Sequence, residues 1–191
     1  MLRAYIVSIF AVFCTINTVF AVPNEPISFH PAAPPELQHF APLLGSWRIT
    51  EETLKTDGSG WLERPNADWH FYLAMNGWAI RDEYFSPALD IAIGDEKNRT
   101  IGSNLRVSDS SKGQWHMTWL NKSGSVSNMF TALSDGQQIV MLSAQANASG
   151  YYNRITFFAM TAESFEWKLE WSKDPQGGWF EVGRIHAKRQ E

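Results

Sequence analysis

Cysteine is nearly absent from this sequence. The 191 residues contain one, Cys14, and it lies in an N-terminal segment that we expect to be removed. The remaining chain then has no thiol, which excludes disulfides, cysteine metal sites and thiolate catalysis. The fold must therefore be held together by core packing alone.

An excess of positive charge is missing as well. The formal net charge is −4 and the pI about 5.7, so no basic field exists to hold nucleic acid or anionic lipid headgroups. The motifs of serine hydrolases, zinc proteases and nucleotide-binding loops do not occur, and no two His residues have metal-ligand spacing. We therefore expect no nucleic-acid partner and no metal.

A long apolar run occurs only at the N-terminus. Residues 1–21 combine the charged Arg3, an apolar stretch over 4–13 and compact residues at 19–21, which is typical of a signal peptide cleaved before Val22. Polar residues after the stretch leave it shorter than the ~20 residues that a membrane span needs. We predict an exported protein, periplasmic or extracellular, with no stable membrane insertion once the signal is removed.

The rest of the chain divides into an arm and one domain. Residues 22–42 form a Pro-rich arm in which 36–41 can make a short helix that begins after Pro35 and ends at Pro42. We expect this helix to act as a plug or brace. Residues 43–191 are long enough for a single domain with a substantial core.

The single domain has the pattern of an all-β protein. Aromatic residues make up 14% of the sequence, with nine Trp, and turn residues recur every 8–12 positions or so. We predict a single antiparallel up-and-down β-barrel of about ten strands, with a two-sheet sandwich as the alternative. The expected strands are 46–56, 66–75, 78–86, 98–107, 114–122, 125–133, 137–146, 150–160, 164–172 and 178–188.

Asn76-Gly77 predicts the register of the second and third strands. This dipeptide favours a two-residue turn, which pairs Met75 with Trp78 and all residues whose numbers have the same sum. One face of the hairpin is then aromatic and apolar, and the other is mostly polar. The interior face carries Trp69, Phe71, Trp78, Asp82 and Tyr84.

A second hairpin is expected at Ser123-Gly124. A two-residue loop there places Trp119 opposite Asn128 and turns Trp115 inward, with Ser127 outside. Strand 164–172 alternates cleanly, with Trp167 on its apolar face. In strand 98–107 we expect 101, 103, 105 and 107 to face inward and Arg106 outward, and the inward face of strand 150–160 stays open.

The last strand carries two polar residues of interest. If Phe180 and Val182 face inward, Arg184 and His186 do so too, next to the first strand of a closed barrel. A buried guanidinium needs a partner, for which Asp82 is the candidate. Arg184 then either fixes a ligand or packs on Trp47 and closes the barrel.

Several segments resemble a known group of barrels. Leu44-Gly45-Ser46-Trp47 resembles the Gly-x-Trp that opens the first strand of calycins, the lipocalins and fatty-acid-binding proteins, and Arg184-Ile185-His186 resembles the Arg-x-Tyr of fatty-acid-binding proteins. The middle of the chain, including Trp69-His70-Phe71 and Asn76-Gly77-Trp78, is similar to an uncharacterised set of bacterial calycin-like proteins. The resemblance implies a barrel that holds a small ligand. Nitrobindin-like barrels share the Leu-Gly-x-Trp start and bind haem through a His near the C-terminus, which implies His186 as the haem ligand here.

The sequence thus favours an exported lipocalin-like binding protein for a small, largely apolar or aromatic molecule. No catalytic residue and no cofactor is expected under this hypothesis. Three alternatives stay open: a cofactor-free isomerase or cyclase using Asp82, Arg184 and His186, a haem barrel, or a solid barrel whose outer surface serves a protein partner. The predicted ligand-binding residues are Trp69, Phe71, Trp78, Asp82, Tyr84, Trp115, Trp119, Asn128, Trp167, Arg184 and His186. The sequence does not indicate an oligomeric state.

Overall fold

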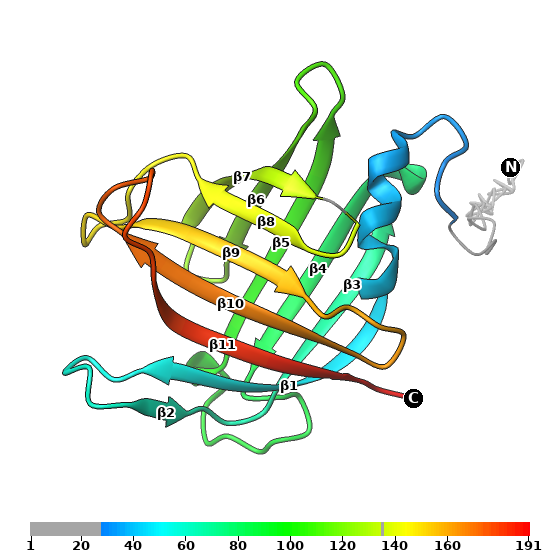
Figure 1. The fold of residues 1–191 in the computed structure, drawn as a ribbon. Coiled ribbons are helices and arrows are strands. Elements are labelled where there is room, and N and C mark those ends of the chain that lie inside the picture. Colours follow the sequence, from blue (N-terminus) through cyan, green and yellow to red (C-terminus); the bar gives the residue numbers. More distant parts are fainter. Residues whose placement is uncertain (1–27, 135) are drawn as a thin grey trace, which may run out of the picture.

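Alternating polar and apolar residues form strands along almost the whole domain (Figure 1). The computed structural model describes residues 28–134 and 136–191. The expected signal peptide, its cleavage point and Cys14 lie outside these residues. The described strands are β1 (Gly45–Leu54), β2 (Trp61–Glu63), β3 (Ala67–Ala74), β4 (Ala79–Ser86), β5 (Thr100–Asp109), β6 (Gln114–Asn121), β7 (Val126–Ser134), β8 (Ile139–Ser143), β9 (Tyr152–Phe158), β10 (Ser164–Ser172) and β11 (Phe180–Arg189).

The strands form one antiparallel barrel. From β3 to β11 each strand pairs with the next along the chain, β1 pairs with β3, and β11 returns to pair with β1. The short β2, which the sequence pattern missed, pairs only with β1. Because the first and last long strands are hydrogen-bonded neighbours, the predicted up-and-down barrel is confirmed and the two-sheet sandwich is wrong.

The β3–β4 hairpin has the predicted register. Trp69 pairs with Tyr84 and Phe71 with Asp82, as the Asn76-Gly77 turn requires. Asn76 and Gly77, in the short 3-10 turn η2 (Met75–Gly77), both have positive φ, 53° and 84°. A two-residue hairpin turn of this kind needs two such residues, which explains why its sequence predicts the register.

The β6–β7 hairpin is one residue longer than predicted. Trp119 pairs with Ser127, and Thr118 with Asn128. Gly124 has φ 84° and donates its N–H to the Asn121 carbonyl, so the loop is a turn followed by a left-handed glycine. The predicted pairing of Trp119 with Asn128 is therefore wrong, and Ser127 shares the inner face instead.

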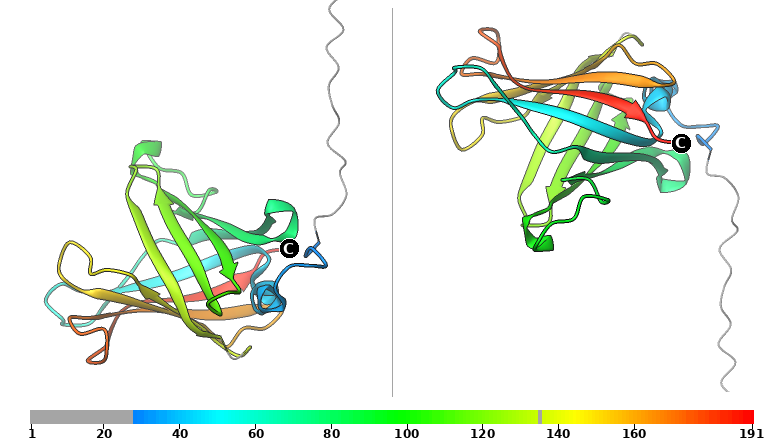
Figure 2. Two further views of the ribbon diagram at one scale, coloured as in Figure 1. Left: turned by 90° about the horizontal axis from the view of Figure 1, so that it is seen from above. Right: turned by 90° about the horizontal axis from the view of Figure 1, so that it is seen from below.

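A 3-10 helix, η1 (Pro35–Leu43), lies at one end of the barrel (Figures 1 and 2). Leu37, Phe40 and Leu43 are buried, and the Phe40 ring packs edge-on against Trp115 with 4.9 Å between centroids. The expected plug is thus present, although it runs past Pro42. Pro42 removes only one backbone N–H donor from this last turn, and the Leu44 N–H still donates to the Ala41 carbonyl at 3.2 Å. No helix in the described part of the chain is both long and apolar enough to cross a membrane.

Trp47 lies where the first strand, β1, and the last strand, β11, pair and close the barrel. It is fully buried, its indole N–H donates to the Leu43 carbonyl at 2.7 Å, and it pairs across the β1–β11 ladder with Arg189. The Arg189 guanidinium lies 4.1 Å from the Trp47 ring centroid and donates to the Leu44 and Pro42 carbonyls. The predicted closing residue, Arg184, is therefore wrong: β11 does close on Trp47, but through Arg189.

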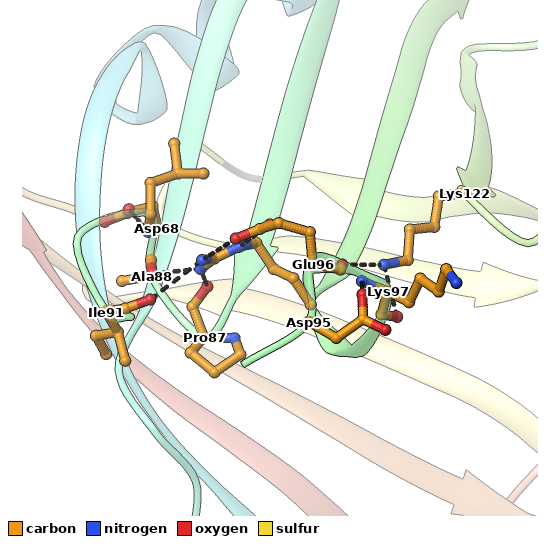
Figure 3. A network of polar contacts seen from close by, with 10 residues as sticks. Asp68, Pro87, Ala88, Ile91, Asp95, Glu96, Lys97 and Lys122 are labelled. Atoms are coloured by element: carbon orange, nitrogen blue, oxygen red, sulfur yellow. Dashed lines mark hydrogen bonds and ion pairs between the residues drawn. The ribbon is translucent and has the colours of Figure 1, made fainter. Parts of the chain in front are cut away.

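The β4–β5 connection, at the end of the barrel away from η1, is built around Arg99, and Figure 3 labels its partners Pro87, Ala88, Ile91 and Glu96. The guanidinium bonds the Glu96 carboxylate and the carbonyls of Pro87, Ala88 and Ile91. Glu96 belongs to the 3-10 turn η3 (Glu96–Asn98), whose carbonyls also accept from Lys122. This network gives a long irregular loop fixed partners for its backbone.

Candidate functional site

The barrel contains a cavity of about 410 Å³. Its lining includes Asn147 from the β8–β9 loop, and the β8–β9 and β10–β11 loops lie at the end of the barrel opposite η1 (Figure 1). This volume is within the range of small-molecule sites. Its aromatic and Met lining comprises Trp69, Tyr84, Met117, Trp119, Met129, Met141, Phe157, Trp167 and Trp171. Its polar lining comprises Glu51, Asn104, Arg106, Ser127, Asn147 and Asn153.

A buried ion pair lies at the inner end of the cavity. Asp82 is fully buried, and its carboxylate accepts from the Arg106 guanidinium, from Trp69 Nε1 at 2.8 Å and from Asn104 Nδ2 at 2.9 Å. Because β4 pairs Asp82 directly with Asn104, these side chains enter the barrel side by side. The three donors compensate a charge that is costly to bury alone.

Arg106 is also enclosed by aromatic rings. Its guanidinium carbon lies 5.6 Å from the Phe40 ring centroid, 5.5 Å from Phe71 and 5.9 Å from Phe157. Only 1% of the residue is exposed. Cation–π contacts of this kind suit a guanidinium, and they connect the η1 plug to the floor of the cavity.

Two polar atoms of this cluster have no hydrogen-bond partner among the described residues. They are Asn104 Oδ1 and Arg106 Nε, and both side chains line the cavity. Their residues are 4% and 1% exposed. Buried polar groups are normally paired, so this cluster contains two polar atoms whose burial is not compensated by a hydrogen bond.

A second polar pair lies toward the open end. The Tyr84 hydroxyl donates to Glu51 Oε2 at 2.7 Å, and both residues line the cavity. Burial raises the pKa of the Tyr84 phenol well above its ordinary value, and the charge and hydrogen bond of Glu51 raise the pKa further. The phenol therefore stays a hydrogen-bond donor at neutral pH.

Four of the predicted ligand-binding residues line the cavity, namely Trp69, Tyr84, Trp119 and Trp167. Three others face the interior but lie in the packed layer around it: Phe71, Asp82 and Trp115 are 2%, 0% and 3% exposed. The structure thus brings these seven together, as floor and walls of one space.

Trp78 and Asn128 are not in the predicted positions. Trp78 is 39% exposed at the tip of the β3–β4 hairpin and stacks on His30, with 4.7 Å between ring centroids. It follows the turn directly, where the strand has not yet entered the barrel. In the β6–β7 ladder, Asn128 pairs with Thr118 and not with Trp119, because the loop has one more residue than predicted.

Arg184 and His186 lie on the outside of the barrel. Arg184 donates to Glu52 at 2.8 Å and packs over the Trp61 ring, whereas His186 Nδ1 is 2.6 Å from Glu166. Their predicted inward orientation is wrong because Gly183, Ile185 and Ala187 face inward instead. Gly183 lies beside the Trp167 ring, and a Cβ there would make an ordinary contact with that ring at 3.7 Å.

The residues that the acid–base enzyme and the haem barrel would require do not meet in the cavity. Asp82, Arg184 and His186, the set required by the acid–base hypothesis, are not brought together, and His186 does not reach the cavity where it would bind an enclosed haem. In the described part of the chain, no three His, Cys, Asp or Glu side chains are grouped to hold a metal ion.

Asn104 and Arg106 are the residues of the polar cluster that the sequence pattern missed. Strand β5 was expected to turn 101, 103, 105 and 107 inward, but Gly102, Asn104 and Arg106 face the interior and Leu105 is 40% exposed. Gly102 has a steric reason, since a Cβ there would overlap the Trp119 ring. The available signal was Asp82, whose predicted burial required a cationic partner on a neighbouring strand.

Comparison with known proteins adds information on the fold alone. No family model matches the chain, and no curated protein matches it. Among solved structures, the S-type phycobiliprotein lyase CPES from Guillardia theta is similar, with a TM-score of 0.51 and 14% identity. The match covers 81% of this chain and 92% of that one. The chain therefore has a calycin-like barrel fold, and its function has to be argued from its own cavity.

Proposed function

We propose that this protein is an exported binding protein that holds one small, largely apolar or aromatic molecule inside its barrel. The observation that supports it most is the cavity of about 410 Å³, whose walls are mainly aromatic and Met side chains. A barrel evolved for packing alone would fill such a space, because an empty apolar cavity destabilises a protein. Met side chains adapt to ligand shape, and aromatic side chains supply large contact areas.

The ligand can enter the barrel at the end opposite the η1 plug. The η1 plug, with Phe40 packed on Trp115 and Arg106, covers one end. Glu51, Trp171 and the residues Asn147 and Asn153 line the cavity at the other end, next to the hairpin loops. The ligand would pass the polar residues at this rim of the cavity, and its body would lie among the Trp rings.

Binding can be tested with N-phenyl-1-naphthylamine, a neutral dye that fluoresces strongly in apolar surroundings. We expect saturable binding of one dye per chain. The matched variants are Ser127→Trp, which fills the cavity from β7, and Leu120→Trp, which adds the same ring on the exposed outer face of β6. The first should weaken binding at least tenfold and the second should leave it unchanged. Absent dye binding by a folded wild-type chain, or equal binding by both variants, would contradict the proposal.

A further inference from the structure

One carboxylate in the cavity wall has no cationic partner. Glu51 and Arg106 are the charged side chains among the described residues that line the cavity, and the buried Asp82 carboxylate already compensates Arg106. The side-chain partner of Glu51 in the described part of the chain is the Tyr84 hydroxyl alone. The charge of Arg64 acts on the Tyr84 phenol, but this exposed residue forms no ion pair with Glu51. The cavity wall therefore carries one unbalanced negative charge.

Strand β1 places Glu51 on the inner face of the barrel. Ile49, two positions earlier, is fully buried, and side chains two positions apart on a strand share a face. Across the β1–β11 ladder, Glu51 pairs with Ile185, which is 5% exposed and also lines the cavity. The next residue, Glu52, lies on the outer face, where it accepts from Arg184. The two neighbouring glutamates thus hold their carboxylates on opposite sides of the barrel wall.

One oxygen of the Glu51 carboxylate is left for a ligand. Oε2 accepts from the Tyr84 hydroxyl at 2.7 Å, which holds the carboxylate in place. Oε1 has no hydrogen-bond partner in the described part of the chain, and it is not one of the enclosed polar atoms that lack a partner. Oε1 is therefore accessible, and because the side chain faces inward, a group inside the cavity can reach it.

Aromatic rings surround the Glu51–Tyr84 pair. The Tyr84 ring packs edge-on against Trp69 and Trp119, with 5.8 and 6.5 Å between centroids. Trp167 comes from β10, two strands away from β1, and lies edge-on to Trp69 with 6.4 Å between centroids (Figure 1). Aromatic faces attract cations electrostatically, and the rings also offer apolar contact area. The space beside the carboxylate therefore suits a cation that is attached to an apolar body.

A protonated amine complements both features of this site. An ammonium group supplies an N–H donor for Oε1 and a positive charge that balances the carboxylate. A hydroxyl group can donate to Oε1 but leaves the negative charge unbalanced. A carboxylate has no donor at neutral pH, and it adds a second negative charge to the cavity.

We infer that the cavity selects an apolar or aromatic ligand that carries a protonated amine, and that Glu51 Oε1 accepts a hydrogen bond from this amine. The inference rests on the proposed function and names its ligand class. Hydrogen bonds between charged groups are roughly twice as strong as neutral ones, so an analogue with a hydroxyl in place of the ammonium should bind about tenfold more weakly.

The test is displacement of bound N-phenyl-1-naphthylamine by three matched compounds at neutral pH. 2-Naphthylmethylamine is a cation that donates, 2-naphthalenemethanol donates without a charge, and 2-naphthoate is an anion. We expect the amine to displace the dye at concentrations at least tenfold lower than either of the others. Equal or better displacement by the alcohol or the acid, or no displacement by any of the three, would overturn the inference. Failure of the dye itself to bind would instead refute the proposed function.

The two neighbouring glutamates provide a matched pair of variants. Glu51→Gln keeps the side-chain length and an oxygen that accepts from Tyr84 but removes the charge, so the amine should lose its advantage over the alcohol. Glu52→Gln removes the same charge from the outer face, and the advantage should remain.

The neutral dye should bind to both variants as it binds to the wild-type chain, which shows that they are folded. Retention of the amine's advantage in folded Glu51→Gln, or an equal loss in Glu52→Gln, would overturn the inference. If Glu51→Gln does not fold, the three compounds decide the matter with the wild-type chain.

Discussion

The Asp82–Arg106 pair predicts a strong coupling in stability. Both side chains are almost completely buried, at 0% and 1% exposure. Removing one member leaves the other charged and enclosed, which typically costs about 3–5 kcal/mol. Arg106→Met keeps the stem that packs between Phe40, Phe71 and Phe157 but leaves the Asp82 carboxylate with only its Trp69 and Asn104 donors. Asp82→Asn keeps a hydrogen-bonding amide but leaves the guanidinium without its counterion.

The double variant, Asp82→Asn with Arg106→Met, should be more stable than either single variant. It contains neither charge, and the new amide oxygen can still accept from Trp69 and Asn104. We expect a coupling free energy of about 2 kcal/mol or more. Each single variant should lower the Tm by roughly 6–20 °C, because a domain of this size loses about 2–4 °C per kcal/mol.

Urea unfolding followed by tryptophan fluorescence measures these differences, since four of the nine Trp line the cavity. The four chains of the cycle should be compared at one pH, with unchanged m values as evidence that the variants unfold from similar states. If the free-energy losses of the two single variants simply add in the double variant, within about 0.5 kcal/mol, the two charges are not coupled and the argument that Asp82 compensates Arg106 is refuted.

Three further predictions follow from other parts of the molecule. Gly102→Ala should destabilise the barrel by about 1–3 kcal/mol in urea unfolding, because the added methyl overlaps the Trp119 ring; a loss below 0.5 kcal/mol would contradict this close contact. Above pH ~10 the unfolded chain loses the Tyr84 proton while the fold, which raises the pKa of that phenol, keeps it, so stability should fall by up to about 1.4 kcal/mol per pH unit. Tyr84→Phe should show a correspondingly shallower fall between pH 9 and 11, and identical slopes would argue against the buried phenol. Expression of the whole chain in a bacterial host should yield an exported form that begins at Val22 by N-terminal sequencing, whereas an intact Met1 start in the exported fraction would contradict the signal peptide.

The extent to which sequence predicts this fold depends on where the deciding interactions lie. The β3–β4 register followed from two residues, because Asn76 and Gly77 adopt the positive φ values that the turn requires within the turn itself. The β6–β7 register failed by one residue, since Gly124 serves as the third residue of a longer loop. A glycine in a loop signals positive φ, but it does not indicate how many residues precede it.

The faces of β5 and β11 were assigned wrongly for a related reason. Both assignments assumed that the larger apolar residues point inward, yet the interior takes Gly102 beside Trp119 and Gly183 beside Trp167. The Trp119 ring leaves room only for glycine at position 102, whereas a Cβ at position 183 would make an ordinary contact with the Trp167 ring. Such size complementarity between strands is a property of the assembled barrel, and no single strand displays it.

The candidate site was accordingly predicted in part. The aromatic walls Trp69, Tyr84, Trp119 and Trp167 follow from strand alternation. The polar floor could not be predicted in this way. Arg106 and Asn104 are buried there, although the residue pattern of their own strand gives no reason to bury that face. The only link is that the buried Asp82 carboxylate needs a cationic partner. We predicted Arg184, 102 positions after Asp82, whereas the partner in the structure is Arg106, 24 positions after it.

Native mass spectrometry of the protein isolated from the organism that makes it tests the central claim most directly. We predict one small molecule bound per chain, of a mass that fits an apolar or aromatic compound small enough for the cavity, and its loss in Ser127→Trp but not in Leu120→Trp. Recovery of a ligand-free wild-type chain that also fails to bind N-phenyl-1-naphthylamine, or a ligand retained equally by both variants, would contradict the assignment of the barrel interior as a binding site.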